Sequence, residues 1–282
     1  MPAAAARGIV LELLHPIPSL LTTVAALGFA WIFGIGSRDP RFWSIGAIML
    51  LVQFSISALN EWADAGLDRR AGRQRPIPLG LVSRGAALTL AVVCAVSAFS
   101  LCVLSNLGPL ALLLVGLGTS CGWAYDLWLK ATPLSFVPFA IAFPLMPFWI
   151  GVLAGRPLMS LIVLFVGGSP LAGAIHLGDS IPDRDRDREA GLKTLAVALG
   201  KPAAEMAAAG LLLLGTLVSI VLLIRRGQPS IGALSLVAVA GSGVVVGLSA
   251  RGTPSSSLLG KWAVIAAAAV AAVPLVVSVS EP

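Results

Sequence analysis

The amino-acid sequence predicts an all-α integral membrane protein with about nine transmembrane helices. Two observations carry this prediction. The chain of 282 residues is 57% hydrophobic and only 11% charged, with a mean hydropathy of +0.95, whereas soluble domains are about 25% charged. Its hydrophobic residues also gather in runs close to the roughly 20 residues that a membrane-spanning helix needs. We therefore expect a helical bundle in the lipid bilayer.

Nine hydrophobic runs qualify as spans. The first is long enough to remain as a membrane anchor rather than a cleaved signal peptide. The fifth contains several prolines, and we expect these to kink the helix. Proline is tolerated in a membrane span because neighbouring helices can satisfy the carbonyls that it leaves unpaired. The runs cover about 16–34, 43–61, 84–104, 107–123, 133–154, 157–177, 201–224, 229–249 and 260–278.

The basic residues predict how these spans are oriented. Of the 19 Lys and Arg residues, 14 fall in the N-terminal segment and at the loops after the second, fourth, sixth and eighth spans. By the positive-inside rule this side of the membrane is cytoplasmic. The net charge of +6 therefore reflects membrane orientation, and no nucleic-acid partner is expected.

Acidic residues are rare, and most of them form two matched clusters. Of the 13 Asp and Glu residues, eight fall in the segments 61–68 and 179–189. Within these segments, two ladders of residues spaced four apart begin at the ends of the second and sixth spans, 119 positions from each other. The first ladder is Asn60, Asp64 and Asp68, and the second is Asp179, Asp183 and Asp187.

The matched ladders predict an internal repeat and a single functional site. Carboxylates beside a membrane interior are costly and usually functional. If spans one to four and five to eight form two four-helix units, the ladders occupy equivalent positions, and the ninth span is an extra helix. The predicted halves cover about 16–123 and 133–249. Both ladders are expected on the cytoplasmic side, so we interpret them as one site built from two halves of the chain.

The chemistry of the ladders favours a hard metal ion. Residues four apart lie near one face of a helix, although Pro182 is expected to interrupt the second helix. Clustered carboxylates repel one another unless a cation lies among them. Oxygen ligands without His or Cys suit Mg²⁺ or Mn²⁺, and Mg²⁺ commonly joins carboxylates to substrate phosphates.

Basic residues beside the ladders extend this to a metal-diphosphate site, because the planar arginine side chain matches phosphate oxygens. Tyr125 and Lys130, in the loop after the fourth span, lie on the same predicted side. The bases that accompany the ladders are Arg69, Arg70, Arg73 and Arg75, and Arg184, Arg186, Arg188 and Lys193.

These residues also have other interpretations. The charges of each ladder could simply neutralise one another on a solvated helix face. A calcium loop starting at Asp183 fails, because Arg188 stands where that motif needs Gly and Thr194 where it needs Glu. His176 is expected to be a packing or hydrogen-bonding residue, with a substrate role as the alternative. The three cysteines, which lie within predicted spans, are expected to be small buried side chains.

In these segments the chain resembles the UbiA superfamily of intramembrane prenyltransferases. The first ladder is similar to the family motif N-x-x-x-D-x-x-x-D, and it is followed by Arg75-Pro76-Ile77-Pro78, similar to R-P-[LI]-P. The second ladder is followed by a stretch from Gly191 to Gly200 similar to G-x-x-T-L-A-x-x-L-G. Tyr125 with Lys130 resembles a third family loop.

The chain also departs from the family pattern. Glu61 replaces the usual Asp after the Asn, Asp126 stands where many members have Ser, and Leu79 replaces a common Ser. The short spacing from Asp68 to Arg75 is similar to that of lipid-ether and chlorophyll-type members rather than the hydroxybenzoate type, so the acceptor stays open.

The resemblance implies a fold and an activity. The fold is a single domain over residues 1–282 with helices around a central cavity, capped by cytoplasmic loops. The activity is Mg²⁺-dependent transfer of a polyprenyl group from an allylic prenyl diphosphate to an aromatic or other lipophilic acceptor, with release of diphosphate. The implied metal ligands are Asn60, Asp64, Asp68, Asp179 and Asp183. The implied catalytic residues are Asp64, Asp68, Asp183 and Asp187, and the implied diphosphate-binding residues are Arg73, Arg75, Lys130, Lys193 and Tyr125.

Rival functions of two classes remain at this point. A membrane terpene cyclase, or an enzyme that moves a sugar phosphate onto a polyprenyl phosphate, would use the same fold. A transporter of anions or divalent ions belongs to a different class, but it would favour charges deep inside the spans, and the predicted span centres have none.

Overall fold

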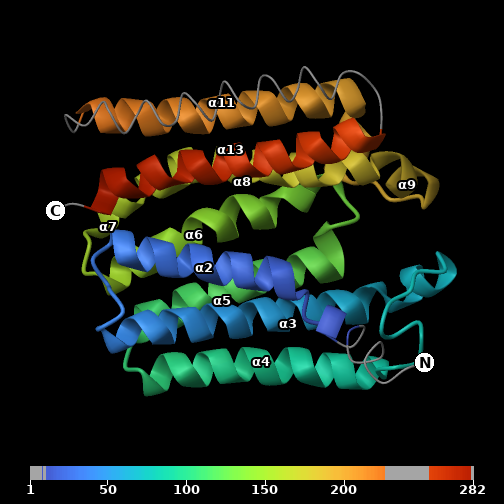
Figure 1. The fold of residues 1–282 in the computed structure, drawn as a ribbon, viewed down its shortest axis with the longest axis horizontal. Coiled ribbons are helices and arrows are strands. Elements are labelled where there is room, and N and C mark those ends of the chain that lie inside the picture. The colour runs from blue at the N-terminus through green and yellow to red at the C-terminus, as the bar shows by residue number, and fades with distance from the viewer. Residues whose placement is uncertain (1–7, 9–10, 226–253, 281–282) are drawn as a thin grey trace. The chain divides into compact units, whose positions relative to one another are not determined.

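The computed structural model describes residues 8, 11–225 and 254–280, and every regular element within them is a helix (Figure 1). This confirms the predicted all-helical class. The chain divides into two compact units, Met1–Leu127 and Trp128–Pro282. Each unit has a central helix; the first ladder lies toward the C-terminal end of one, and the second ladder begins at the C-terminal end of the other.

The first unit is built around the long helix α3, Pro40–Arg70, which packs against three other helices. These are α2 (Pro16–Ile32), α4 (Arg84–Leu104) and α5 (Pro109–Ala124). A five-residue π-helix, η1 (Tyr125–Leu129), directly continues α5.

Local sequence signals explain where helices of this unit begin. Proline occupies the first turn of α2, α3 and α5, where its missing N–H group costs no hydrogen bond. Asp39 caps α3 by accepting a hydrogen bond from the Arg41 backbone N–H at 2.9 Å. Hydrogen bonds from the Arg41 side chain also hold the pKa of the Asp39 carboxyl below its ordinary value. Ser83 caps α4 by accepting from the Ala86 N–H at 3.0 Å.

The second unit is built around α8, Val163–Ser180, which packs against α6, α11 and α13. Shorter elements connect these helices and follow α8 toward the second ladder. In chain order the elements are η2 (Pro133–Phe136), α6 (Val137–Leu153), α7 (Leu158–Leu161), α8, η3 (Ile181–Asp183), α9 (Arg184–Glu189), α10 (Leu195–Leu199), α11 (Lys201–Arg225) and α13 (Pro254–Ser280).

Small residues let the helices of the second unit approach closely. A methyl group at Gly215 of α11 would lie 2.6 Å from Leu171 Cγ and 2.8 Å from the carbonyl oxygen of Gly167 on α8. Gly173 and Gly178 of α8 are similarly close to Leu211 and Val264. Close backbone approach through small residues is typical of helix packing in membranes, where lipid is as apolar as the side chains.

The helices match eight of the nine predicted spans. Among the described residues, seven helices are long and apolar enough to cross a membrane, and α2 is an apolar helix of 17 residues. The eighth predicted span, 229–249, lies outside the described residues, so the count of nine stays a prediction. The internal repeat also stays a prediction.

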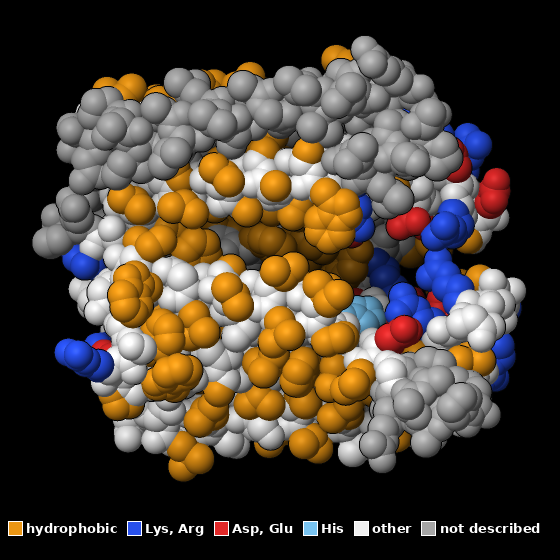
Figure 2. Space-filling view, in the orientation of Figure 1, with side chains coloured by type: hydrophobic (Ala, Val, Ile, Leu, Met, Phe, Trp, Pro, Cys, Tyr) orange, Lys and Arg blue, Asp and Glu red, His pale blue; other side chains and the backbone are white. Residues whose placement is uncertain are grey.

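Apolar side chains also lie on the outer surfaces of the helices. Trp31, Trp43 and Met206 are among the large hydrophobic residues that are more than 60% exposed. In the space-filling view, hydrophobic side chains cover the described helix surfaces, whereas Lys, Arg, Asp and Glu gather at helix ends (Figure 2). Such a surface is expected of a protein solvated by lipid along its helices.

The glycine contact between α11 and α8 is testable by substitution. We expect Gly215→Ala to destabilise the fold by about 1–3 kcal/mol, because the added methyl meets a backbone oxygen that cannot move aside independently. The measurement is the midpoint of thermal unfolding in detergent. Gly210→Ala on the same helix is the matched control, since a Cβ there meets nothing within 4 Å, and it should be neutral or stabilising. Equal midpoints for the two variants would contradict the packing argument.

Candidate active site

The first ladder lies on one uninterrupted helix. Because α3 continues to Arg70, Asn60, Asp64 and Asp68 follow one another along about 12 Å of the same helical edge. Asn60 and Asp64 are partly buried, and Asp68 is 4% exposed. A single helix therefore carries the whole of the first ladder.

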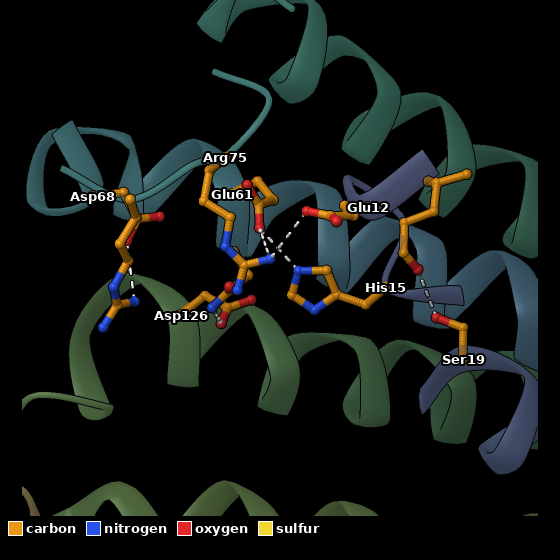
Figure 3. Close-up of polar contacts among 10 residues, drawn as sticks. Glu12, His15, Ser19, Glu61, Asp68, Arg75 and Asp126 are labelled. Atoms are coloured by element: carbon orange, nitrogen blue, oxygen red, sulfur yellow. Dashed lines mark hydrogen bonds and ion pairs between the residues drawn. The ribbon is translucent and has the colours of Figure 1, made fainter. Parts of the chain in front are cut away.

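The π-helix η1 brings a carboxylate against the start of this ladder. The side-chain amide of Asn60 donates a hydrogen bond to Asp126 Oδ1 at 2.8 Å, and Asp126 is 3% exposed (Figure 3). The Asn60 amide thus points its N–H group toward Asp126. The π-helix is a rare conformation that often occurs at functional sites, and here it begins at Tyr125, which is partly buried.

The loop after α3 folds back onto the ladder through two arginines. Arg73 lies 3.1 Å from Asp68 Oδ1. Arg75 Nη1 lies 3.5 Å from Glu61 Oε1 and 4.0 Å from Glu12 Oε2. Two of the predicted diphosphate-binding residues are therefore held beside α3 by its own carboxylates, whereas Arg69 and Arg70 are exposed at the end of the helix.

Glu61, which replaces the usual Asp of the family motif, is part of this arrangement. Glu61 is 2% exposed and accepts a contact from His15 Nε2 at 2.9 Å as well as from Arg75 (Figure 3). Its second oxygen, Oε2, is buried without a hydrogen-bond partner. In the sequence, these contacts are indicated only by Glu61 itself and by two polar residues just before the first span, Glu12 and His15.

The second ladder is broken into three short pieces, as expected from Pro182. Asp179 lies in the last turn of α8, Asp183 ends the 3₁₀ turn η3, and Asp187 lies in α9. Asp183 is exposed and lies 2.9 Å from Arg186 Nη1, and the off-register Asp185 pairs with Arg184. This ladder is therefore more exposed than the first, and its members do not share one helix.

Lys261 is a partner of the second ladder that the sequence interpretation missed. Its Nζ lies 2.6 Å from Asp179 Oδ1, which joins the start of α13 to the end of α8. Lys261 stands at the beginning of the last predicted span. That end of the span is predicted to lie on the cytoplasmic side of the membrane, as both ladders are, and this could have suggested that Lys261 lies near a ladder.

Two predicted diphosphate-binding lysines are brought together within the second unit. The backbone N–H of Lys193 donates to the carbonyl of Ala131 at 3.1 Å, so the loop after α9 lies against the residue that follows Lys130. Lys193 is exposed and Lys130 partly buried. These lysines come from segments more than 60 residues apart in the sequence, and this hydrogen bond joins the two segments.

A buried serine and histidine fix this pair of segments. Ser135 Oγ and His176 Nε2 share a hydrogen bond of 2.9 Å, and the Leu195 N–H donates to the same hydroxyl at 3.4 Å. The His176 ring also lies 4.7 Å from the ring of Phe139, and its exposure is 2%. These contacts confirm the packing and hydrogen-bonding interpretation of His176.

No compact metal cage is present in either unit's described part. Among the described residues, no group of three or more His, Cys, Asp or Glu side chains is arranged to hold a metal ion. Cys94, Cys102 and Cys121 are buried thiols without a disulfide, as expected.

Comparison with known proteins identifies the family. The UbiA prenyltransferase family matches residues 19–257, which is most of the chain. The chain belongs to the UbiA prenyltransferase family. It is therefore a prenyltransferase and a multi-pass membrane protein, and the family resemblance inferred from its motifs is confirmed.

The relatives and solved structures agree with this assignment. The chain is 28% identical over 197 residues to a digeranylgeranylglyceryl phosphate synthase from Korarchaeum cryptofilum, with 68% of each chain covered. It is 28% identical over 190 residues to a 4-hydroxybenzoate octaprenyltransferase from a Polaromonas species, with 66% of each chain covered. A UbiA homolog from Archaeoglobus fulgidus, solved with GPP and Mg²⁺, has a TM-score of 0.71 at 18% identity, covering 94% of this chain and 98% of that one.

The serine that joins the lysine-bearing segments offers a test of the second unit. We expect Ser135→Ala to lower the free energy of unfolding by about 1–3 kcal/mol, because it leaves buried polar partners on His176 and Leu195 unsatisfied. Thermal unfolding in detergent gives the measurement. Ser100→Ala, at an exposed position of α4, is the control and should leave the midpoint within experimental error. An unchanged midpoint for Ser135→Ala would show that this contact does not fix the segments.

Proposed function

We propose that the protein catalyses Mg²⁺-dependent transfer of a polyprenyl group from an allylic prenyl diphosphate to an aromatic or other lipophilic acceptor, with release of diphosphate. One observation carries the proposal: in each unit, carboxylates lie beside Arg or Lys side chains at the C-terminal end of the central helix. The complex of the Archaeoglobus fulgidus homolog with GPP and Mg²⁺ and the names of the relatives support the same substrate class.

The available donors fit a hard metal ion. The side-chain amide nitrogen of Asn60 donates a hydrogen bond to Asp126. The side-chain amide oxygen, Oδ1, is therefore the atom of Asn60 that could bind a metal. The other donors are carboxylate oxygens, the type that Mg²⁺ prefers and that Mn²⁺ accepts. We propose Asn60, Asp64 and Asp68 as metal ligands in the first unit, and Asp179 and Asp183 as metal ligands in the second. When bound, Mg²⁺ supplies positive charge that stabilises the leaving diphosphate.

The ladder carboxylates already have cations near them. Asp68 pairs with Arg73, Asp183 with Arg186 and Asp179 with Lys261. We propose that these side-chain cations turn to the diphosphate oxygens when the carboxylates bind metal, so that no carboxylate is left without a neighbouring positive charge. An exposed pair such as Asp183 with Arg186 is weak and exchanges at little cost.

The remaining proposed roles concern the diphosphate and the reaction itself. Arg73, Arg75, Lys130, Lys193 and Tyr125 are proposed to bind phosphate oxygens as negative charge develops on the leaving group, which is electrostatic stabilisation of the transition state. Asp64, Asp68, Asp183 and Asp187 are the proposed catalytic carboxylates. The apolar helices exclude water, which would otherwise capture the allylic cation. The N-terminus and both ladders are proposed to face the cytoplasm.

Substitution of one carboxylate in each unit tests the reaction. We expect Asp64→Asn and Asp183→Asn each to reduce release of diphosphate from geranylgeranyl diphosphate by at least about 100-fold, a typical cost of losing electrostatic stabilisation. Glu12→Gln and Asp185→Asn are the matched controls, because they remove an exposed charge in the same regions without touching a ladder. Full activity in both ladder variants would overturn the proposal.

Metal removal gives a second test. Chelation with EDTA should abolish diphosphate release by the purified protein, and Mg²⁺ should restore it, with Mn²⁺ as a partial substitute. The measurement is diphosphate released per minute at fixed substrate. Activity that persists in excess EDTA would exclude the metal role of the ladders.

The acceptor is tested by its product. Labelled geranylgeranyl diphosphate is incubated with an alkyl glyceryl phosphate, a hydroxybenzoate or no acceptor, and the lipid extract is examined by mass spectrometry. A prenylated product formed only with acceptor supports the transferase. A hydrocarbon or terpenol formed without acceptor would instead indicate a terpene cyclase.

A further inference from the structure

We propose that Glu61 is a positioning residue that holds Arg75 beside the first ladder, with His15 holding Glu61 in turn. The inference rests on the proposed function, because it concerns an arginine that we assign to diphosphate binding. It adds a role for the segment that precedes the first span, which neither the metal chemistry nor the family motifs require.

Glu61 lies on the side of α3 that carries Asp68, the last member of the first ladder. It lies seven residues before Asp68, which is about two helical turns, so the two carboxylates project from nearly the same side of the helix. Asp68 pairs with Arg73, and Glu61 pairs with Arg75. The loop after α3 therefore makes two arginine contacts along the side of the helix that carries Asp68.

The contact between Glu61 and Arg75 leaves most of the guanidinium available. Nη1 of Arg75 lies 3.5 Å from Glu61 Oε1, and arginine has five N–H donors in a planar fork. The side chain of Arg75 is 36% exposed and that of Glu61 only 3%. A buried carboxylate thus holds one edge of the fork, and the other edge remains for phosphate oxygens.

The second Glu61 oxygen suggests that the pair can tighten. Oε2 is buried and has no hydrogen-bond partner, and a buried unsatisfied acceptor is costly. A small rotation of the guanidinium toward Glu61 would satisfy this oxygen and convert the contact to the bidentate geometry that arginine and carboxylate favour.

His15 fixes Glu61 from the other side. Its Nε2 lies 2.9 Å from the same oxygen that Arg75 contacts (Figure 3). His15 has a positive φ of 42° at the residue that precedes α2, a backbone conformation that residues other than glycine seldom adopt. This conformation directs the ring to Glu61 and ties the start of α2 to α3.

The test compares diphosphate binding in Glu61→Gln, Arg75→Ala and the double variant. Gln keeps the shape of Glu61 and removes its charge. We expect about a tenfold weaker affinity for inorganic diphosphate in Glu61→Gln, the usual scale for losing a charged hydrogen bond. The affinity is measured as the concentration dependence of the thermal unfolding midpoint in the presence of Mg²⁺. The apparent KM for geranylgeranyl diphosphate should rise by a similar factor, with little change in kcat.

Two comparisons separate positioning from a general structural effect. In the Arg75→Ala background, Glu61→Gln should weaken diphosphate binding no further, because its effect passes through Arg75. Glu12→Gln is the matched control: it removes a charge 4.0 Å from the same guanidinium but half-exposed, and it should change the affinity less than about twofold. If the Gln variant does not fold, Glu61→Asp retains the charge and should bind diphosphate with an affinity between those of wild type and Arg75→Ala.

Two results would overturn the proposal. One is equal diphosphate affinity in Glu61→Gln and wild type, and the other is the same loss of affinity from Glu61→Gln whether or not Arg75 is present. Failure of the proposed function is a separate observation, full activity of Asp64→Asn, and the binding comparison does not depend on turnover.

Discussion

Carboxylates on the central helices are the constraint around which both units are arranged. A carboxylate beside an apolar interior must have a positive charge close by. In the first unit that charge comes from a loop that folds back, through Arg73 and Arg75, onto α3. In the second it comes from Lys261 on another helix and from arginines of α9. The charge partners of the ladders therefore decide where the loops and helix ends of each unit lie.

The two units differ in how their ladder carboxylates are buried and paired with cations. On α3 the ladder lies on one continuous helix, and Glu61, Asp68 and Asp126 are each less than 5% exposed. After α8 the chain turns at Pro182, and Asp179 and Asp183 are exposed and paired with flexible side chains. The first ladder thus lies on a single helix, whereas the second is divided among α8, η3 and α9.

The sequence was enough to predict the fold class, the family and the positions of the ladders, because these depend on run length and on spacing along a helix. It also predicted the break at Pro182, which follows from the missing N–H of proline. It did not reveal that Glu61 contacts His15 and Arg75, or that Lys261 pairs with Asp179. Those contacts join residues 14, 46 and 82 positions apart, so they depend on tertiary packing and leave no periodic signal. The π-helix at Tyr125 was equally invisible, since its residues also fit an α-helix.

That π-helix has an evolutionary consequence. A π-turn holds one residue more than an α-turn, so a one-residue insertion can enter a helix without breaking it. Removal of a residue from 125–129 would restore a regular helix and rotate everything downstream by about 100°. Lys130, the first residue after the segment, would then project from a different side of the chain. The segment is therefore a point where a single codon gained or lost, rather than any change of side chain, could re-aim a cation within this family.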